Sequence, residues 1–469
     1  MLVKHKKTLI SFVSLFCSLC FVVTSLCVYK TGLFKGLNLE VDRQKEVARL
    51  EQLEGETVEG IFLDRSGLEI TSYAAPGKTA RVNDSEAFSY LIGYRSPRLK
   101  TSGLRDRYYT DLLDGGKDGV GATIQLTVNA DLQKKLYGLL QGSVGSVSVI
   151  NAATGEVLAL ASRGDPEVGY DVNLIDTYYD EEKKLFYSDY YNKIPDFWHQ
   201  RAVFADDPPG SCAKIVTAVS LVENGYGDLE YNDTGREMDQ RIHNYNYAVY
   251  GFTNLEKALN KSVNTFFANA SANVLGGVKM KKTYNRFMVG KTVELDFATL
   301  RSTYLTKSDA SDFVIASNGY GQGELMMAPL HLAMTAGALM NEGVMMKPYV
   351  VKQIVNDETT TYEAKHEVLS QATDSNTATR VKELLHSNAV YYGLHNLFSE
   401  EEIYIIAKTG TADVREGKSG NHIYYTLGCE IDGVPYGICI DQASTSDMSG
   451  SLKTKAISVL RILMDTLHQ

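Results

Sequence analysis

The sequence predicts a mixed α and β protein (α/β or α+β) that follows an N-terminal membrane anchor. Three patterns indicate this: an apolar run at residues 8–28, alternating apolar strands around a turn at 146–161, and a buried helix that begins near Ser211. Strands in which apolar residues alternate with polar ones, and a helix that is apolar on nearly all sides, both have apolar surface to bury. They bury it in one shared core when helices pack against a sheet. The chain of 469 residues, 44% of them hydrophobic, is long enough for two or more domains.

Net charge and ligand patterns exclude several classes of partner. The formal net charge is −10, and no Lys/Arg-rich patch interleaved with aromatic residues occurs. Such patches bind nucleic-acid phosphates, so we expect no nucleic-acid partner. The chain also has no His-Glu-x-x-His motif or comparable ligand cluster. We therefore expect no metal and no cofactor.

Residues 8–28 are almost uninterrupted apolar residues and follow the basic segment Lys4-His5-Lys6-Lys7. At about 1.5 Å per residue this run spans roughly the 30 Å hydrocarbon core, and the basic residues before it stay in the cytoplasm. A cleaved signal peptide is the alternative, although no small-x-small cleavage site follows the run. We expect residues 1–30 to be a cytoplasmic tail and a single membrane anchor, which places the remaining chain outside the cell membrane.

Residues 31–140 are expected to form an elongated, non-catalytic spacer. Residues 39–53 combine many charges with periodic Leu and Val, which is typical of an amphipathic helix leaving the membrane. Residues 61–67 have the pattern of a strand entering a turn, residues 122–128 alternate as a strand does, and a helix is expected at 131–140. No chemistry is visible in this part of the sequence.

The next segment predicts the opening of the core sheet. Residues 146–150 and 157–161 are apolar and alternating, and they flank the Gly-containing turn Asn151-Ala152-Ala153-Thr154-Gly155. Two such runs around a turn predict a β-hairpin.

A buried helix carries the first chemical motif. Pro208-Pro209-Gly210 cannot continue a helix but can lead into one, and Gly225 is suited to end it, so we expect a helix from about Ser211 to Asn224. Ser211 and Lys214 are three residues apart and share one face. A lysine kept from water loses its proton more readily, and its neutral amine can take the proton of a serine nucleophile. The alternative is a serine that only caps the helix and a lysine that extends into solvent.

Ser262-Val263-Asn264 is the second motif. Its hydroxyl can relay a proton between lysines, and its amide can hold a substrate amide. Alternatively, Ser262 is a helix N-cap.

Lys408-Thr409-Gly410-Thr411 is the third motif and follows a strand pattern at 402–407. Lys408 offers a positive charge to an anionic substrate end, and the two threonine hydroxyls can bind a carboxylate. Gly410 lets another backbone approach the strand closely. A second Lys-Thr-Gly at 30–32 borders the anchor, and we interpret it as accidental.

Two smaller patterns are open to more than one interpretation. Cys429 and Cys439 are either paired across adjacent strands or buried thiols. The run at 319–323 lacks the third glycine of a dinucleotide fingerprint and the lysine of a P-loop. We interpret it as a turn ahead of a helix at 328–341, with Pro329 in the first turn.

Taken in order, the three motifs resemble those of the penicillin-binding proteins and serine β-lactamases. Residues 64–67, 91–113, 151–160 and 321–330 are further similar to the single-span, class B penicillin-binding proteins. The resemblance implies a penicillin-binding transpeptidase fold over residues 141–469, in which helices cover an antiparallel five-stranded sheet and a helical subdomain lies beside it.

The resemblance also implies a role for each motif residue. The residues that would perform catalysis are Ser211 as nucleophile, Lys214 as general base, Ser262 and Lys408. The residues that would bind substrate are Asn264, Thr409, Gly410 and Thr411. The backbone N–H groups of Ser211 and Thr411 would form the oxyanion hole.

The implied activity is that of a membrane-anchored D,D-transpeptidase, which cross-links peptidoglycan stem peptides ending in D-Ala-D-Ala and is inhibited by β-lactams. A lipid II polymerase is the implied partner. A D,D-carboxypeptidase or β-lactamase-type hydrolase and a penicillin-binding scaffold or sensor remain alternatives. The sequence departs from the family pattern at Cys212, where small or hydroxylated residues are usual, and at 422–428, where the usual tryptophan is missing. These departures concern substrate detail and antibiotic affinity.

Overall fold

The structure is a computed structural model. It describes residues 56–96, 100–164, 169–180, 185–186, 200–204, 207–300, 302–304, 307, 309–394, 398, 403–413, 421–444 and 449–467. The expected anchor at 8–28 and the expected amphipathic helix at 39–53 lie outside these ranges. Within them, no helix combines the length and the hydropathy needed to cross a membrane.

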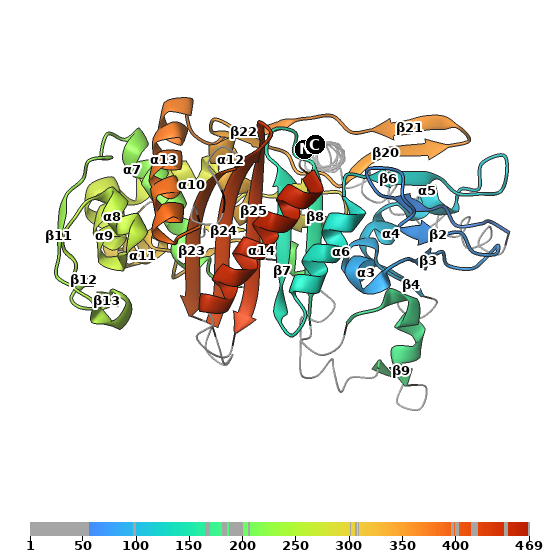
Figure 1. The fold of residues 1–469 in the computed structure, drawn as a ribbon, viewed down its shortest axis with the longest axis horizontal. Helices are drawn as coiled ribbons and strands as arrows, with labels where there is room; N and C mark the ends of the chain where they lie inside the picture. The colour runs from blue at the N-terminus through green and yellow to red at the C-terminus, as the bar shows by residue number, and fades with distance from the viewer. Residues whose placement is uncertain are drawn as a thin grey trace, which may run out of the picture.

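A five-stranded antiparallel sheet runs through the middle of the molecule (Figure 1). In spatial order its strands are β23 (Tyr404–Asp413), β24 (Asn421–Ile431), β25 (Val434–Ser444), β7 (Val144–Asn151) and β8 (Val157–Arg163). The hairpin predicted at 146–161 is confirmed as β7 and β8, and the third motif lies within the edge strand β23. The sheet implied by the resemblance is therefore confirmed.

Helices cover both faces of this sheet. Helix α12 (Pro329–Met340) packs against β7, β24 and β25, and all of its residues are buried, as its apolar sequence requires. Helices α6 (Ala130–Leu139) and α14 (Ser449–Leu467) cover the other face (Figure 1). The helices expected at 131–140 and 328–341 are confirmed within one or two residues.

A helical subdomain lies beyond the edge strand β23 (Figure 1). Its helices are α7 (Lys214–Glu223), α8 (Leu255–Asn260), α9 (Asn264–Asn269), α10 (Gly276–Arg286) and α11 (Asp312–Gly319). A π-helical turn, η5 (Ala270–Leu275), joins α9 to α10. Helix α13 (Ser375–Tyr391) contacts β23, α7 and α8, so it ties the subdomain to the sheet.

The end of the molecule opposite the helical subdomain is built largely from the described residues 56–126, which lie within the segment that the sequence analysis expects to be a spacer (Figure 1). Its sheet has the order β1-β6-β20-β21, with strands β1 (Phe62–Leu63), β6 (Thr123–Leu126), β20 (Val351–Asn356) and β21 (Thr359–Glu363). Its other elements are β2 (Thr71–Ser72), β3 (Arg81–Val82), α3 (Ser85–Ile92), β4 (Arg95–Ser96), β5 (Lys100–Thr101), α4 (Gly103–Arg107) and α5 (Tyr109–Leu113). Two of the four strands come from residues 351–363, so the later part of the chain completes this sheet.

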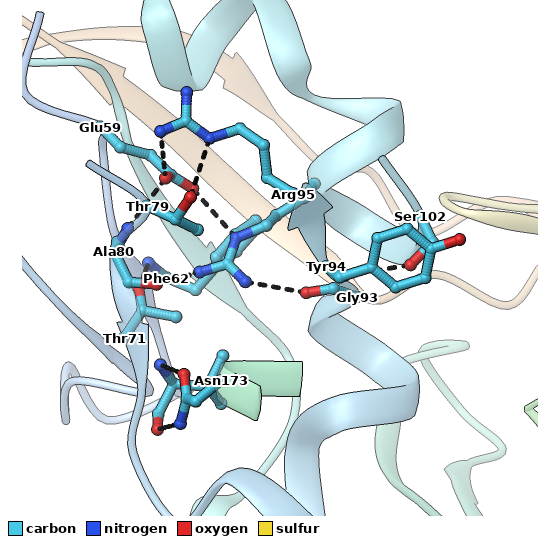
Figure 2. Close-up of polar contacts among 12 residues, drawn as sticks. Glu59, Phe62, Thr71, Thr79, Ala80, Gly93, Tyr94, Arg95, Ser102 and Asn173 are labelled. Carbon is cyan, nitrogen blue, oxygen red and sulfur yellow. Dashed lines mark hydrogen bonds and ion pairs between the residues drawn. The ribbon is translucent and has the colours of Figure 1, made fainter. Parts of the chain in front are cut away.

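Polar contacts around Glu59 hold this end of the molecule together (Figure 2). The buried Glu59 carboxylate accepts hydrogen bonds from Arg105 Nε at 2.9 Å and from Ala80 N at 2.9 Å, and Arg95 Nη2 lies 3.4 Å away. Arg105 also donates to the carbonyls of Gly93 and Ala80. A buried carboxylate with several charged and backbone partners is compensated for its lost hydration, which makes this network structural.

The remaining described elements are short and connect these layers. They are η1 (Val172–Tyr178), β9 (Tyr179–Asp180), β10 (Leu185–Phe186), η2 (Arg201–Val203), η3 (Gly210–Ala213), β11 (Tyr231–Asp233), β12 (Arg236–Glu237), β13 (Ile242–His243), η4 (Tyr245–Tyr247), β14 (Gly251–Thr253), β15 (Val293–Leu295), β16 (Ala298–Leu300), β17 (Thr303–Tyr304), β18 (Leu325–Met326), β19 (Val344–Met346) and β22 (Val368–Gln371).

Candidate active site

The predicted helix at 211–224 begins differently from the expectation. Gly210 adopts a left-handed conformation with φ of +53°, and residues 210–213 form the 3₁₀ turn η3 before α7 starts at Lys214. In a 3₁₀ turn, residues three apart lie directly above one another. Ser211 is half-buried, whereas Lys214 is fully buried. The alternative of a lysine that extends into solvent is therefore wrong.

Two lysine amines lie on either side of one serine hydroxyl. Lys214 Nζ is 3.1 Å from Ser262 Oγ, and Lys408 Nζ is 3.2 Å from the same oxygen. Lys214 Nζ also donates to Ser262 O at 2.8 Å and to Asn264 Oδ1 at 2.7 Å. The structure thus brings four predicted residues from three separate motifs into one hydrogen-bonded group.

The environment of Lys214 favours its neutral form. Burial, followed by the positive charge of Lys408, lowers the pKa of the Lys214 ammonium well below its ordinary value. Both causes act in the same direction, because burial removes hydration from a cation and a neighbouring cation repels it. An amine with a lowered pKa can accept a proton near neutral pH.

Ser262 is not a helix N-cap, because Val263 takes that position in α9. Instead, Ser262 has a φ of +52°, in the left-handed region that few residues other than glycine adopt. The next motif residue, Asn264, uses both ends of its amide: Oδ1 accepts from Lys214, and Nδ2 donates to His243 O at 3.0 Å. These two contacts fix the orientation of the amide.

Strand β23 lies directly against the serine turn. A Cβ atom added to Gly410 would lie 2.4 Å from Pro209 O, and one added to Gly210 would lie 2.4 Å from Thr411 O. Cys212 Sγ contacts Lys408 O at 3.4 Å from within the core. Both glycines are therefore needed for the close approach of the two segments, as the sequence predicted for Gly410.

Sequence reasoning missed Tyr392, which follows α13. Its hydroxyl lies 2.9 Å from Thr409 Oγ1 and 3.4 Å from Lys408 Nζ. Burial raises the pKa of Tyr392, but the charge of Lys408 and hydrogen bonds outweigh it, so the pKa lies below its ordinary value. No local pattern marks this tyrosine, because the fold alone brings it to Lys408. The other threonine of the motif, Thr411, is exposed.

Asp233 is a second residue that the sequence did not reveal. Its buried carboxylate accepts hydrogen bonds from Thr265 Oγ1 at 2.6 Å, Asn244 Nδ2 at 3.0 Å, Gly235 N at 2.9 Å and Tyr250 N at 2.7 Å. These contacts join the loop between β11 and β14 to the residue that follows Asn264. The turn signal Asp233-Thr234-Gly235 was the only available clue.

Cys212, Cys429 and Cys439 are free and buried. Of the two alternatives for Cys429 and Cys439, the structure has the buried thiols.

In the described part of the chain, no group of three or more His, Cys, Asp or Glu side chains has an arrangement suited to a metal ion.

The sequence matches a known family over more than half of its length. The model of the family described as "Penicillin binding protein transpeptidase domain" matches residues 145–431. Penicillin-binding protein 3 of Bacillus subtilis is 28% identical over 242 residues, which cover 50% of this chain and 35% of that protein. Peptidoglycan D,D-transpeptidase PbpA of Mycolicibacterium smegmatis is 24% identical over 359 residues, which cover 69% of each chain.

A third relative is peptidoglycan D,D-transpeptidase MrdA of Escherichia coli, which is 25% identical over 383 residues. The match covers 73% of this chain and 58% of MrdA. The chain thus spans about a third of the Bacillus protein and between half and seven tenths of the other two.

Solved structures share the fold. The D,D-transpeptidase domain of a peptidoglycan glycosyltransferase from Eggerthella lenta has a TM-score of 0.75 at 23% identity, covering 88% of this chain and 99% of that one. Penicillin-binding protein A from Mycobacterium tuberculosis, solved as an imipenem acyl-enzyme complex, has a TM-score of 0.76 at 19% identity, with coverages of 87% and 99%.

Proposed function

This chain belongs to the penicillin binding protein transpeptidase domain family, and on that premise we propose that it is a D,D-transpeptidase that cross-links peptidoglycan stem peptides through an acyl-serine intermediate. The observation that carries the proposal is the position of Ser262 Oγ between Lys214 Nζ at 3.1 Å and Lys408 Nζ at 3.2 Å. Relatives named D,D-transpeptidases support transfer to an amine over transfer to water.

The acylation step uses Lys214 as general base. Neutral Lys214 takes the hydroxyl proton of Ser211 as the serine oxygen attacks the carbonyl of the penultimate D-alanine. The backbone N–H groups of Ser211 and Thr411 receive the oxyanion. In support of this pairing, a Cβ atom on Gly210 would lie 2.9 Å from Thr411 N, so the two backbones are neighbours.

The proton then passes from Lys214 through the Ser262 hydroxyl to the nitrogen of the departing D-alanine, and the C–N bond breaks. Asn264 holds the peptide amide, while Thr409 and Thr411 bind the terminal carboxylate beside the charge of Lys408. In the second half-reaction, an acceptor amine attacks the acyl carbonyl, loses its proton by the reverse route, and releases Ser211. A β-lactam acylates the same oxygen by opening its ring.

The remaining parts of the chain fit a protein of the cell envelope. We propose that residues 8–28 anchor it in the cell membrane, that residues 31–140 form the spacer, and that residues 141–469 work outside the membrane. A lipid II polymerase would supply the glycan strands that this enzyme cross-links.

The test uses the detergent-solubilised full chain. Fluorescent penicillin should label the wild-type chain, and Ser211→Ala should remove the label. A stem-peptide thioester supplied with a D-amino acid should give the transfer product. Release of the free acid alone would assign the chain to the hydrolases, and labelling that survives Ser211→Ala would refute the nucleophile.

A further inference from the structure

Exposed apolar side chains gather on the loop beside Asn264. Among the large hydrophobic side chains that are exposed in the described part of the chain, four lie between residues 245 and 252, including Tyr245 at 74% and Phe252 at 61% exposure. Burial of such side chains is favourable, so a concentration of them on one loop is typical of a contact surface.

This loop is held firmly despite its exposure. Asp233 ties its two ends together through Asn244 and Tyr250 N. Lys257 Nζ donates to Tyr250 O at 2.7 Å and to Phe252 O at 2.6 Å. A surface that is already ordered loses little conformational entropy on binding, which suits recognition of a ligand.

A cavity of about 430 Å³ opens beside Phe252. Tyr391, which is 49% exposed, also lines it, together with Lys261, Lys257 and Glu256. The volume lies within the usual range of small-ligand sites, roughly 300–1,000 Å³. Two aromatic side chains therefore line the cavity together with charged and amide side chains.

Two residues that line the cavity lie next to residues of the candidate active site. Lys261 directly precedes Ser262, and the ring of Tyr391 lies 5.9 Å from the ring of Tyr392 between centroids. The Tyr392 hydroxyl in turn lies 3.4 Å from Lys408 Nζ. A substrate that extends beyond the reacting peptide bond would meet this cavity at the rim of the site.

Two lysines and one glutamate line the cavity, so its net charge favours an anionic group. Glu256 already accepts a hydrogen bond from Ser387 Oγ at 2.6 Å, and the Lys257 amine is occupied by two carbonyls. Lys261 Nζ donates to Tyr391 OH at 2.8 Å and lies 4.7 Å from the centre of that ring. An ammonium group has three donors, so Lys261 can still offer hydrogen bonds to a ligand.

We propose that Phe252, Lys261 and Tyr391 form a second substrate subsite, which binds a carboxylate-bearing segment of the peptidoglycan stem peptide outside the reacting D-Ala-D-Ala unit. This proposal rests on the proposed function, since it places an extended peptide at Ser211. The aromatic rings cover the peptide backbone, and Lys261 binds its side carboxylate.

Equilibrium binding to the full-length Ser211→Ala chain tests the subsite without turnover. The probes are the peptide L-Ala-γ-D-Glu-L-Lys-D-Ala-D-Ala and its analogue with the glutamyl α-carboxylate converted to an amide. We expect the carboxylate form to bind about fivefold more tightly, the magnitude of a favourable exposed ion pair. Adding Lys261→Gln should remove this preference, and Phe252→Ala should weaken both peptides several-fold.

Lys291→Gln, which removes an exposed lysine beside β15, is the matched control and should keep the preference. Equal binding of the two peptides, or a preference that survives Lys261→Gln, would overturn the subsite. Those outcomes are separate from a failure of the proposed function, which Ser211-dependent penicillin labelling reports independently.

Discussion

Replacement of Lys214 by alanine tests the general base. Lys214 is fully buried, and its amine contacts Ser262 O, Ser262 Oγ and Asn264 Oδ1 within 3.1 Å. Loss of general-base assistance typically costs about 10²- to 10⁴-fold in rate, or roughly 3–5 kcal/mol. We therefore expect Lys214→Ala to reduce the second-order rate of penicillin acylation by at least about a hundredfold.

The pH dependence of the acylation rate is a second test of Lys214 as the general base. In the proposed mechanism the neutral amine of Lys214 is the active form, so wild-type acylation should rise with pH and level off above the pKa of Lys214, which lies well below the ordinary lysine value. The charge of Lys408 is the second cause of that lowering. Lys408→Ala should therefore move the rising limb to higher pH, in addition to lowering the rate.

The assay is stopped-flow acylation by fluorescent penicillin between about pH 6 and 10, a range chosen to lie below the ordinary lysine pKa. Lys291→Ala serves as the control for loss of an exposed lysine, and circular dichroism reports whether each variant is folded. A folded Lys214→Ala chain that reacts within tenfold of wild type would refute the assignment of Lys214 as base. An unchanged pH limb in Lys408→Ala would refute the coupling of the two lysines.

Three further substitutions test the surroundings of the site. Gly410→Ala should lower the acylation rate more than about tenfold and lower the melting temperature, because the added Cβ would lie 2.4 Å from Pro209 O. A wild-type rate would show that the two backbones need not be so close. Tyr392→Phe should raise KM for carboxylate-terminated substrates by about fivefold with little change in melting temperature, since it removes only a hydroxyl near Lys408; an unchanged KM would exclude this role. Asp233→Asn should lower the free energy of unfolding by about 1–3 kcal/mol in chemical denaturation, because an amide replaces a buried carboxylate that accepts several hydrogen bonds. Unchanged stability would contradict the importance of these hydrogen bonds to Asp233.

Local patterns predicted part of the secondary structure that frames the site, but not helices α8, α9 and α13. The hairpin β7–β8 and helix α12 follow from period-two and apolar runs that need no distant partner. The pairing of β20 with β6 had no such signal, because it joins Val351 to Leu126 across a long stretch of chain. Register between strands so far apart depends on tertiary packing, which a single sequence does not display.

The motif residues were predictable, but the conformations that bring them together were not. Ser211, Lys214, Ser262 and Lys408 follow from spacing and from the resemblance to a family. The left-handed conformation of Ser262 has no sequence signal, because serine rarely adopts it. It persists here because two lysine amines hold the Ser262 hydroxyl and one holds its carbonyl.

The run at 319–323 is a second case in which the sequence predicted the local structure but not its tertiary contacts. Its glycines predicted a turn, and Gly321 indeed has a φ of +96°. The structure adds that a Cβ on Gly321 would lie 1.7 Å from Gly210 O. This glycine therefore also allows close packing against the serine turn, which only the fold reveals.

The most direct measurement is mass spectrometry of the full chain after reaction with penicillin, followed by proteolysis to locate the adduct. The proposed mechanism predicts one added penicilloyl group on the peptide that contains Ser211, and about a hundredfold less adduct, or still less, on the Lys214→Ala chain at an early, equal reaction time. An adduct on any other residue, or no adduct on a folded wild-type chain, would contradict it.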